Sequence, residues 1–358
     1  MSVGFNSNIP IITICVASLL GFISYYFMKK NKTDDDEVNI EELEYVKVGK
    51  IGELFIYPVK SMKGISVPYI ECSKTGGNYN CIRDRSFMVI NRKTSLHVSG
   101  TKENKLILIE PSINYDSSTS SYVLTLTCEK NSTFVTVNLN DIVKKGDILT
   151  VKVKDGGLGD GLCDGYDCGD EIGNFIKDVI GSSADLRLIY HSESLFRQRY
   201  SIYGSQYSNS NVTTRPHEIR FQADAPYNIV TKQSLNDLNK RYNGSNQIVV
   251  ERFRPIIVVN NTKAYDEDYW KYIKIRTCLL ELVRPCTRCT QITIDPETAE
   301  KHHNMEPLRE LRKYRLTKGR IEKEYCKSPV FGIQLGIRNG GVIKVGDDVF
   351  VNYKKIQF

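Results

Sequence analysis

The sequence predicts a mostly β protein with a few short helices. Residues 122–127 and 133–139 alternate apolar and polar side chains, as half-buried strands do, and the short polar segment between them fits a hairpin loop. After the N-terminal segment, only short stretches have apolar residues at helical spacing. Sheets are therefore expected to supply most of the core. Further strands are expected at residues 46–57, 252–259, 277–283, 328–337 and 340–351, and helices at residues 172–180, 234–239 and 306–315.

The first 28 residues form the predicted membrane anchor. Residues 1–28 carry no charged side chain, and residues 9–28 provide about 20 mostly apolar residues, enough for a helix to span a bilayer. Lys29 and Lys30 follow at once, which by the positive-inside rule places the rest of the chain in the cytosol. A cleaved secretory signal is the alternative, but it would begin with basic residues and have a shorter apolar run. We expect an uncleaved, single-pass anchor followed by a polar, acid-rich tether, residues 29–45.

The composition describes a globular chain without a nucleic-acid signature. Its 358 residues are 41% hydrophobic and 25% charged, which is ordinary for folded domains and enough for two of them. The formal net charge of +7 is spread along the chain, so it suits an anionic ligand or an acidic protein partner, and no nucleic acid is expected. The ten cysteines are scattered from Cys15 to Cys326, as in a reducing compartment.

Two strand-rich domains are expected after the tether. The first covers residues 46–191, the second covers residues 217–355, and a polar connection rich in Ser, Asn and Tyr, residues 192–216, separates them. Residues 156–169 are rich in Gly and Asp but have neither phosphate-loop nor EF-hand spacing, so we interpret them as a loop that ends by capping a helix.

Two turns of the first domain present charged and hydroxyl side chains. Residues 56–64 break a strand at a proline and present Lys60 and Ser61, and residues 81–91 run a charged turn with Arg85 into a strand. Taken alone, such turns are usually solvated surface.

Two cysteines mark the most informative stretch of the chain. Cys286 and Cys289 are expected on a short turn between the strand at residues 277–283 and a strand-like run at residues 291–294. A thiolate is a soft ligand, so a metal-binding role for this turn is chemically reasonable.

The residues around the thiols leave several interpretations open. Arg284 and Arg288 would favour the ionised sulfur and so lower the thiol pKa. His302 has finger-like spacing from the cysteines, which suggests zinc, but no later histidine completes the set. A redox pair would normally lie at a strand-to-helix junction, and two ordinary buried thiols are the simplest alternative.

The stretch RPCTRCTQITIDPETA at residues 284–299 resembles the cysteine motif of the MOSC family (molybdenum cofactor sulfurase C-terminal domain), in particular its two-domain members called mitochondrial amidoxime-reducing components. Those proteins carry a Cys-x-Arg-Cys turn and a Thr-x-Asp-Pro-x-Thr run, here residues 286–289 and 293–298. The similarity extends over about residues 47–353 through further motifs in the same order, namely YPVKSMKG at 57–64, RDR at 83–85, RFRPIIVV at 252–259 and KSPVFG at 327–332.

The resemblance implies a fold, a cofactor and a set of site residues. The fold would be a MOSC β-barrel packed against an N-terminal strand-rich domain, with molybdenum-molybdopterin between them. Cys289 would be the catalytic residue and the ligand of molybdenum. The cofactor would also be contacted by Lys60, Ser61, Arg85, Arg254, Thr287 and Arg288.

The chain departs from that family at a few positions. Ile256 and Gln334 stand where relatives have Asn and Tyr, and Asp224 and Ala225 stand where they have Thr and Ser. One or two cofactor hydrogen bonds are therefore expected to be missing or rerouted. The role of Cys286 is left open.

The implied activity is the reduction of small N-hydroxylated compounds such as amidoximes. The sequence has no haem, flavin or NAD motif, so electrons must come from a partner, which in the family is cytochrome b5 with NADH-cytochrome b5 reductase. The resemblance also favours the mitochondrial outer membrane over the endoplasmic reticulum. The alternatives are a molybdenum cofactor carrier or sulfur-transfer module related to cofactor sulfurase, and a scaffold that has lost the metal.

Overall fold

The computed structural model describes residues 40–153, 161–195, 199–201, 212–213, 215–242, 244, 246–318, 322–325, 327–355 and 357. The chain divides into two units, Met1–Glu44 and Tyr45–Phe358, and the described part of the first contains a short 3-10 helix, η2 (Ile40–Glu42). The predicted anchor, residues 1–28, and most of the tether lie outside the described residues. Within those residues, the search for a helix that could cross a bilayer finds none.

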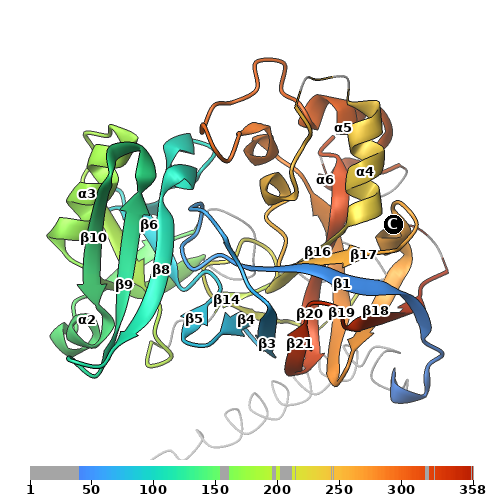
Figure 1. The fold of residues 1–358 in the computed structure, drawn as a ribbon, viewed down its shortest axis with the longest axis horizontal. Coiled ribbons are helices and arrows are strands. Elements are labelled where there is room, and N and C mark those ends of the chain that lie inside the picture. Colours follow the sequence, from blue (N-terminus) through green and yellow to red (C-terminus); the bar gives the residue numbers. More distant parts are fainter. Residues whose placement is uncertain are drawn as a thin grey trace, which may run out of the picture. The chain divides into compact units, whose positions relative to one another are not determined.

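The largest sheet of the second unit closes into a barrel. β1 has 11 residues, and its first half pairs with β22. Its second half pairs with β17, the first strand of the sheet, and this pairing closes the barrel (Figure 1). The register shifts near Gly49, where any side chain would overlap the carbonyl oxygen of Asn260. In pairing order the strands are β17 (Ile257–Asn260), β16 (Tyr227–Thr231), β20 (Val330–Asn339), β19 (Cys278–Thr287), β18 (Trp270–Ile275), β22 (Asp348–Tyr353), β1 (Val46–Ile56) and β2 (Ile65–Ser66).

The N-terminal half of the second unit contains a smaller closed barrel and a three-stranded sheet. The hairpin predicted from residues 122–127 and 133–139 is confirmed, because all of β10 pairs antiparallel with Val123–Cys128 of β9. The barrel consists of β11 (Ile148–Lys152), β12 (Leu162–Asp167), β13 (Leu186–Tyr190), β6 (Phe87–Asn91) and β7 (Leu96–His97), and the sheet of β10 (Thr133–Asn138), β9 (Ser121–Cys128) and β8 (Glu110–Asp116). The mostly β prediction with two strand-rich parts is therefore confirmed.

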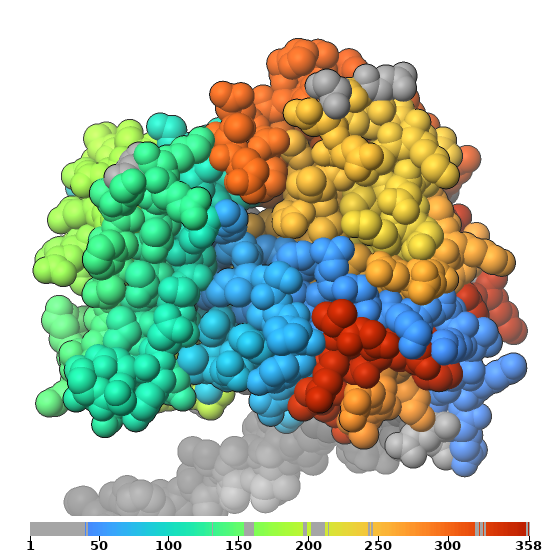
Figure 2. All heavy atoms as spheres, in the orientation of Figure 1, coloured from blue at the N-terminus to red at the C-terminus, as the bar shows by residue number. Residues whose placement is uncertain are grey.

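The two halves exchange strands. β1 opens the predicted first domain, yet it completes the barrel of the C-terminal half. In the other direction, β21 (Gly341–Lys344) pairs with β3 (Tyr69–Ser73), and Figure 2 shows the red C-terminal segment against the blue one. That small sheet continues through β4 (Gly76–Tyr79) and β5 (Ile82–Arg83), and a separate pair joins β14 (Arg199–Tyr200) to β15 (Glu218–Ile219).

Two strand and loop predictions are wrong. Residues 156–169 were expected to be a loop, but their described part contains β12, which pairs with β11 and β13 because Cys163 and Tyr166 can be buried in the small barrel. Residues 291–294 were expected to begin a strand, but they form most of η8. There the backbone N–H of Ile294 donates to Gln291 O at 3.2 Å, so a local turn takes the place of strand pairing.

The three predicted helices are present as α3, α4 and α5, with one cap misassigned, whereas α2 and α6 were not predicted. Thr231, not Ser234, caps α4: its side chain accepts the N–H of Ser234, which is itself buried inside the first turn. The helices are α2 (Leu139–Lys145), α3 (Asp170–Ile180), α4 (Lys232–Arg241), α5 (Leu308–Tyr314) and α6 (Glu322–Tyr325), and the 3-10 helices are η3 (Asn104–Leu108), η4 (Glu129–Asn131), η6 (Val250–Phe253), η7 (Asp266–Tyr269) and η8 (Thr290–Thr293).

Candidate functional site

One pocket, called here the Cys289 pocket, gathers most of the predicted site residues. Arg85 follows β5, Arg254 follows η6, Thr287 ends β19, and Arg288 and Cys289 come next in the chain. Residues some 200 positions apart in the sequence, such as Arg85 and Cys289, thus line the same pocket. Other residues that line the pocket include Gln222, Asp224, Asn228, Ile256, Cys286, Gln291 and Gln334.

The two cysteines have different environments. β19 continues through Thr287, so Cys286 lies in the strand and is buried, whereas Cys289 lies just before η8 and is exposed. Burial raises the pKa of the Cys286 thiol, and this effect exceeds the opposite influence of Arg288. The expectation that both thiols become more acidic is therefore wrong for Cys286. Cys289 is the thiol accessible to a ligand in the pocket.

Arg288 braces the cysteine turn from inside the protein. Its Nε and Nη2 donate to Phe331 O at 2.8 and 2.6 Å, and its Nη1 donates to Phe253 O at 2.9 Å. The side chain is buried, and its backbone N–H donates to Pro329 O. The guanidinium thus ties the turn to β20 and to η6. Most of the hydrogen bonds of its guanidinium go to these two carbonyls, so it holds the turn in position.

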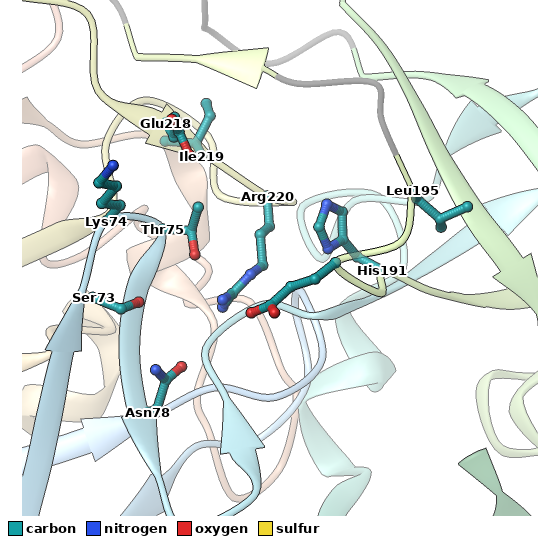
Figure 3. Close-up of a pocket in the computed structure, with 10 residues that line it drawn as sticks. Ser73, Lys74, Thr75, Asn78, His191, Leu195, Glu218, Ile219 and Arg220 are labelled. Atoms are coloured by element: carbon teal, nitrogen blue, oxygen red, sulfur yellow. The ribbon is translucent and has the colours of Figure 1, made fainter. Parts of the chain in front are cut away.

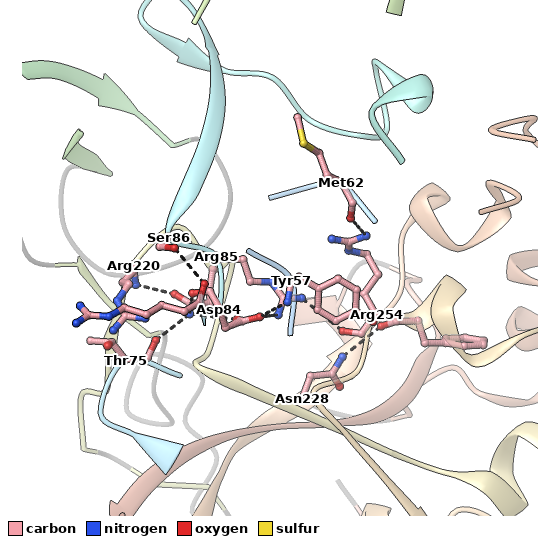
Figure 4. A network of polar contacts seen from close by, with 12 residues as sticks. Tyr57, Met62, Thr75, Asp84, Arg85, Ser86, Arg220, Asn228 and Arg254 are labelled. Atoms are coloured by element: carbon pink, nitrogen blue, oxygen red, sulfur yellow. Dashed lines mark hydrogen bonds and ion pairs between the residues drawn. The ribbon is translucent and has the colours of Figure 1, made fainter. Parts of the chain in front are cut away.

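Two arginines from distant segments stack on one tyrosine. The guanidinium carbons of Arg85 and Arg254 lie 4.5 and 4.3 Å from the ring centroid of Tyr57 (Figure 4). Asp84 is fully buried beside them, accepting from Arg85 Nη1 at 2.7 and 2.8 Å and from the backbone N–H of Tyr57 at 3.0 Å. Asp84 therefore compensates the charge of Arg85 and fixes its side chain.

Arg254 has no such carboxylate within the described part of the chain. Its Nη1 donates to Met62 O at 2.7 Å, and its buried Nη2 has no hydrogen-bond partner among the residues that the structure describes. Burial lowers the pKa of Arg254 to about 10, so the cation is poorly solvated. A buried cation with an unused N–H donor provides a position at which an anionic group would be stabilised.

The backbone is strained at the same place. Ser61, Arg85 and Arg254 have φ angles of 74°, 47° and 51°, in the left-handed region that non-glycine residues rarely adopt. Such strain persists only where the surrounding structure enforces it, and it clusters at functional sites. Three predicted site residues therefore share an uncommon conformation that orients their side chains.

Lys60 and Ser61 are not among the residues that line the Cys289 pocket. Ser61 Oγ accepts the backbone N–H of Gly100 at 3.0 Å. A Cβ on Gly100 would lie 3.1 Å from Ser61 Cβ and 2.9 Å from Oε1 of Gln291, which does line the pocket. Ser61 thus lies next to the pocket wall, and Lys60 precedes it on the same turn.

Several site residues were not assigned a role from the sequence. Gln334 Nε2 donates to Asp224 Oδ2 at 3.2 Å, and Arg284 Nη1 lies 3.7 Å from Asp224 Oδ1. Because a carboxylate only accepts, this bond fixes the amide of Gln334, and its buried Oε1 has no hydrogen-bond partner in the described part of the chain. Tyr57 was also missed, although it is an aromatic residue in the turn at residues 56–64, next to the predicted site residues Lys60 and Ser61.

His302 has a different setting from the one its spacing suggests. Its Nε2 lies 3.2 Å from the hydroxyl of Tyr242, and it lines a pocket with His303 and Asp295 instead of the Cys289 pocket. In the described ranges, no three or more His, Cys, Asp or Glu side chains are grouped so that they could hold a metal ion.

Comparisons with known proteins agree on one family. The model of the MOSC domain matches residues 216–350, and that of the MOSC N-terminal beta barrel domain matches residues 48–183. Mitochondrial amidoxime-reducing component 1 of Mus musculus and that of Homo sapiens are each 31% identical to the chain, over 85% of it and 83% of their own length. The Danio rerio protein of the same name is 28% identical over 86% of both chains.

Proposed function

This chain belongs to the MOSC family, and on that premise we propose that it is a molybdenum-cofactor-dependent reductase of N-hydroxylated compounds of the amidoxime type. The relatives that it resembles over most of their length are named amidoxime-reducing components. The observation that carries the proposal is the exposed Cys289 thiol in a pocket whose wall also holds the unsatisfied guanidinium of Arg254.

The residues present fit molybdopterin in two respects. Cys289 offers an accessible soft sulfur ligand for molybdenum, while buried Cys286 remains a thiol because its pKa is raised. Arg254 offers fixed positive charge for the phosphate of the cofactor, with Arg85, whose own charge Asp84 compensates, beside it and Ser61 on the adjoining turn. When bound, molybdenum supplies the two-electron chemistry by which an amidoxime, two electrons and two protons give an amidine and water.

The other residues of the pocket position these groups. Arg288 holds the turn on which Cys289 lies, and Thr287 adds a hydroxyl that is 3.5 Å from Arg284 Nη2. Ile256 is buried and gives the wall an apolar patch at the point where relatives have an amide. Asp224 and Gln334 also line the pocket and supply acceptors, which would suit the N–H groups of an amidoxime.

The finer parts of the proposal concern location and electron supply. We propose a single-pass anchor at residues 1–28 in the mitochondrial outer membrane with the catalytic part facing the cytosol, which the apolar run and the lysines after it support. We also propose cytochrome b5, reduced by its NADH-dependent reductase, as the electron donor. The net charge of +7 would favour an acidic partner of this kind.

The experiment is a reconstituted assay with the full chain made in a host that produces molybdopterin. Benzamidoxime is supplied as substrate with NADH, cytochrome b5 reductase and cytochrome b5, and benzamidine is measured. A chemical reductant in place of the cytochrome separates failure of the partner from failure of the reaction. Benzamidine that disappears in Cys289→Ala supports the proposal. Bound molybdenum without reduction by either donor would favour a cofactor carrier instead.

A further inference from the structure

A second cavity lies apart from the Cys289 pocket, and the two share no lining residue. Its volume is about 420 Å³. The turn between β3 and β4 forms one side, the segment after β13 forms another, and β15 with Arg220 forms the base (Figure 3). We call it the Arg220 cavity.

Arg220 is buried but extends its guanidinium into this cavity, between Asn78 and His191 (Figure 3). Its relative exposure is 3%, and its Nη1 has no hydrogen-bond partner among the described residues. The backbone is fixed, because its N–H donates to Gln222 Oε1 at 2.6 Å and its carbonyl accepts from Arg199 Nη1 at 2.9 Å. The backbone of Arg220 is therefore held in place, while Nη1 of its buried guanidinium remains unsatisfied by the described residues.

No carboxylate of the described residues is paired with Arg220. The nearest candidates are already engaged, since Asp84 is bonded to Arg85 and Glu193 lies 2.6 Å from Arg83. Burial is the main cause that lowers the pKa of Arg220, and the charge of Arg83 acts in the same direction. A desolvated guanidinium of this kind is stabilised by an anion that can accept from its fork.

Two further buried atoms on the cavity wall lack a partner within the described residues, Nδ1 of His191 and Oδ1 of Asn78. The His191 ring is held edge-on against buried Phe221, with centroids 5.8 Å apart, and its backbone N–H donates to Ser86 O. Buried polar atoms that lack a hydrogen-bond partner are unfavourable, so their presence on the wall of one cavity favours a polar occupant.

We infer that the Arg220 cavity is a binding site for a small organic anion, whose carboxylate or phosphate group accepts from Arg220. His191 and Asn78 lie where they can bond to the remaining polar atoms of the ligand. Leu195 and Ile219 add apolar wall for a short carbon skeleton, and the other charged residues of the lining are Lys74, Glu193 and Glu218. The site is independent of the proposed reductase chemistry.

The test uses NMR of the full chain with carbon-13-labelled histidine. The sequence has five histidines, so the His191 signal can be identified as the one missing in His191→Phe. Inorganic phosphate and acetate are titrated separately at constant ionic strength, with chloride as the reference salt. A saturable shift of the His191 signal is expected with at least one anion, and the anion that saturates at lower concentration identifies the preferred group.

Matched variants locate the binding. Arg220→Gln should weaken the anion roughly 10- to 100-fold, the value of one charged hydrogen bond, whereas Arg254→Gln in the Cys289 pocket should leave the shift unchanged. If Arg220→Gln does not fold, Arg220→Lys keeps the charge but loses the planar fork, and about tenfold weakening is expected. No saturable shift with either anion would show that the cavity holds only water, and an equal shift in the folded Arg220 variant would place the anion elsewhere. Either result overturns the inference.

Discussion

Replacing Arg288 tests whether it braces the cysteine turn or binds the cofactor directly. In Arg288→Met, the apolar stem of the side chain is largely retained while the guanidinium is lost. Phe331 O then loses both of its bonds from this side chain, and Phe253 O keeps only the longer bond from Asn228 Nδ2 at 3.3 Å. One buried carbonyl is thus left unpaired and a second is weakened.

The expected loss of stability follows from these bonds. An unpaired buried carbonyl costs about 1–3 kcal/mol, and a weakened neutral hydrogen bond adds roughly 1 kcal/mol. Relief of the buried charge offsets part of this, so the free energy of unfolding should fall by about 2 kcal/mol. Arg288→Lys can still donate to one carbonyl, and it should lose about half as much.

The assay is urea unfolding of cofactor-free protein, so that no ligand contributes to stability. Cys289→Ala serves as the control, because its side chain is exposed and its removal should change the unfolding free energy by less than about 0.5 kcal/mol. If Arg288→Met unfolds like the original protein but no longer retains molybdenum, Arg288 contacts the cofactor and the bracing role is refuted.

Three further predictions concern single groups. Arg254→Gln should lower molybdenum retention at least about tenfold. It should reduce the unfolding free energy of the cofactor-free protein by less than about 1 kcal/mol, because it removes a poorly solvated cation. A larger loss of unfolding free energy in urea would show that Arg254 is mainly structural. Gly332→Ala should destabilise by about 2 kcal/mol or more in the same assay, since φ is 78° and the new Cβ would overlap Ile229 O; an unchanged midpoint would contradict this. Burial raises the pKa of Glu267 from 4.5 to about 7, so between these pH values the folded state holds a proton that the unfolded state releases. The protonated carboxyl therefore contributes to the free energy of unfolding in full below pH 4.5, and this contribution, about 3 kcal/mol, is lost as the pH rises to 7. Glu267→Gln should flatten the stability–pH curve over that interval, and an equally steep curve would assign the dependence to other groups.

The sequence located the residues of the Cys289 pocket better than it described their roles. Cys289, Arg85 and Arg254 were assigned to one site from separate motifs, and they do line one pocket. Contact of Arg288 with cofactor and thiolate stays a prediction, and the hydrogen bonds of its guanidinium to backbone carbonyls were not foreseen. Such contacts depend on where β20 and η6 pass, which local sequence does not contain.

The fold shows the same division between local and long-range information. The hairpin of β9 and β10 was predictable because its pairing is set by alternation and a short loop. The pairing of β1 with β17 joins residues about 200 positions apart, and no local pattern encodes it. In residues 291–294 the β-branched side chains suggested a strand, but hydrogen bonds within the turn after Cys289 decide the conformation.

Molybdenum analysis of the full chain tests the central claim most directly. The chain and its Cys289→Ala variant are produced in a host that makes molybdopterin, and the metal is measured by mass spectrometry beside a circular dichroism spectrum of each. The account predicts about one molybdenum per chain, lost in the variant while the fold is retained, because the exposed thiol is the proposed ligand. Equal molybdenum in both proteins, or none in a well-folded original chain, would contradict it.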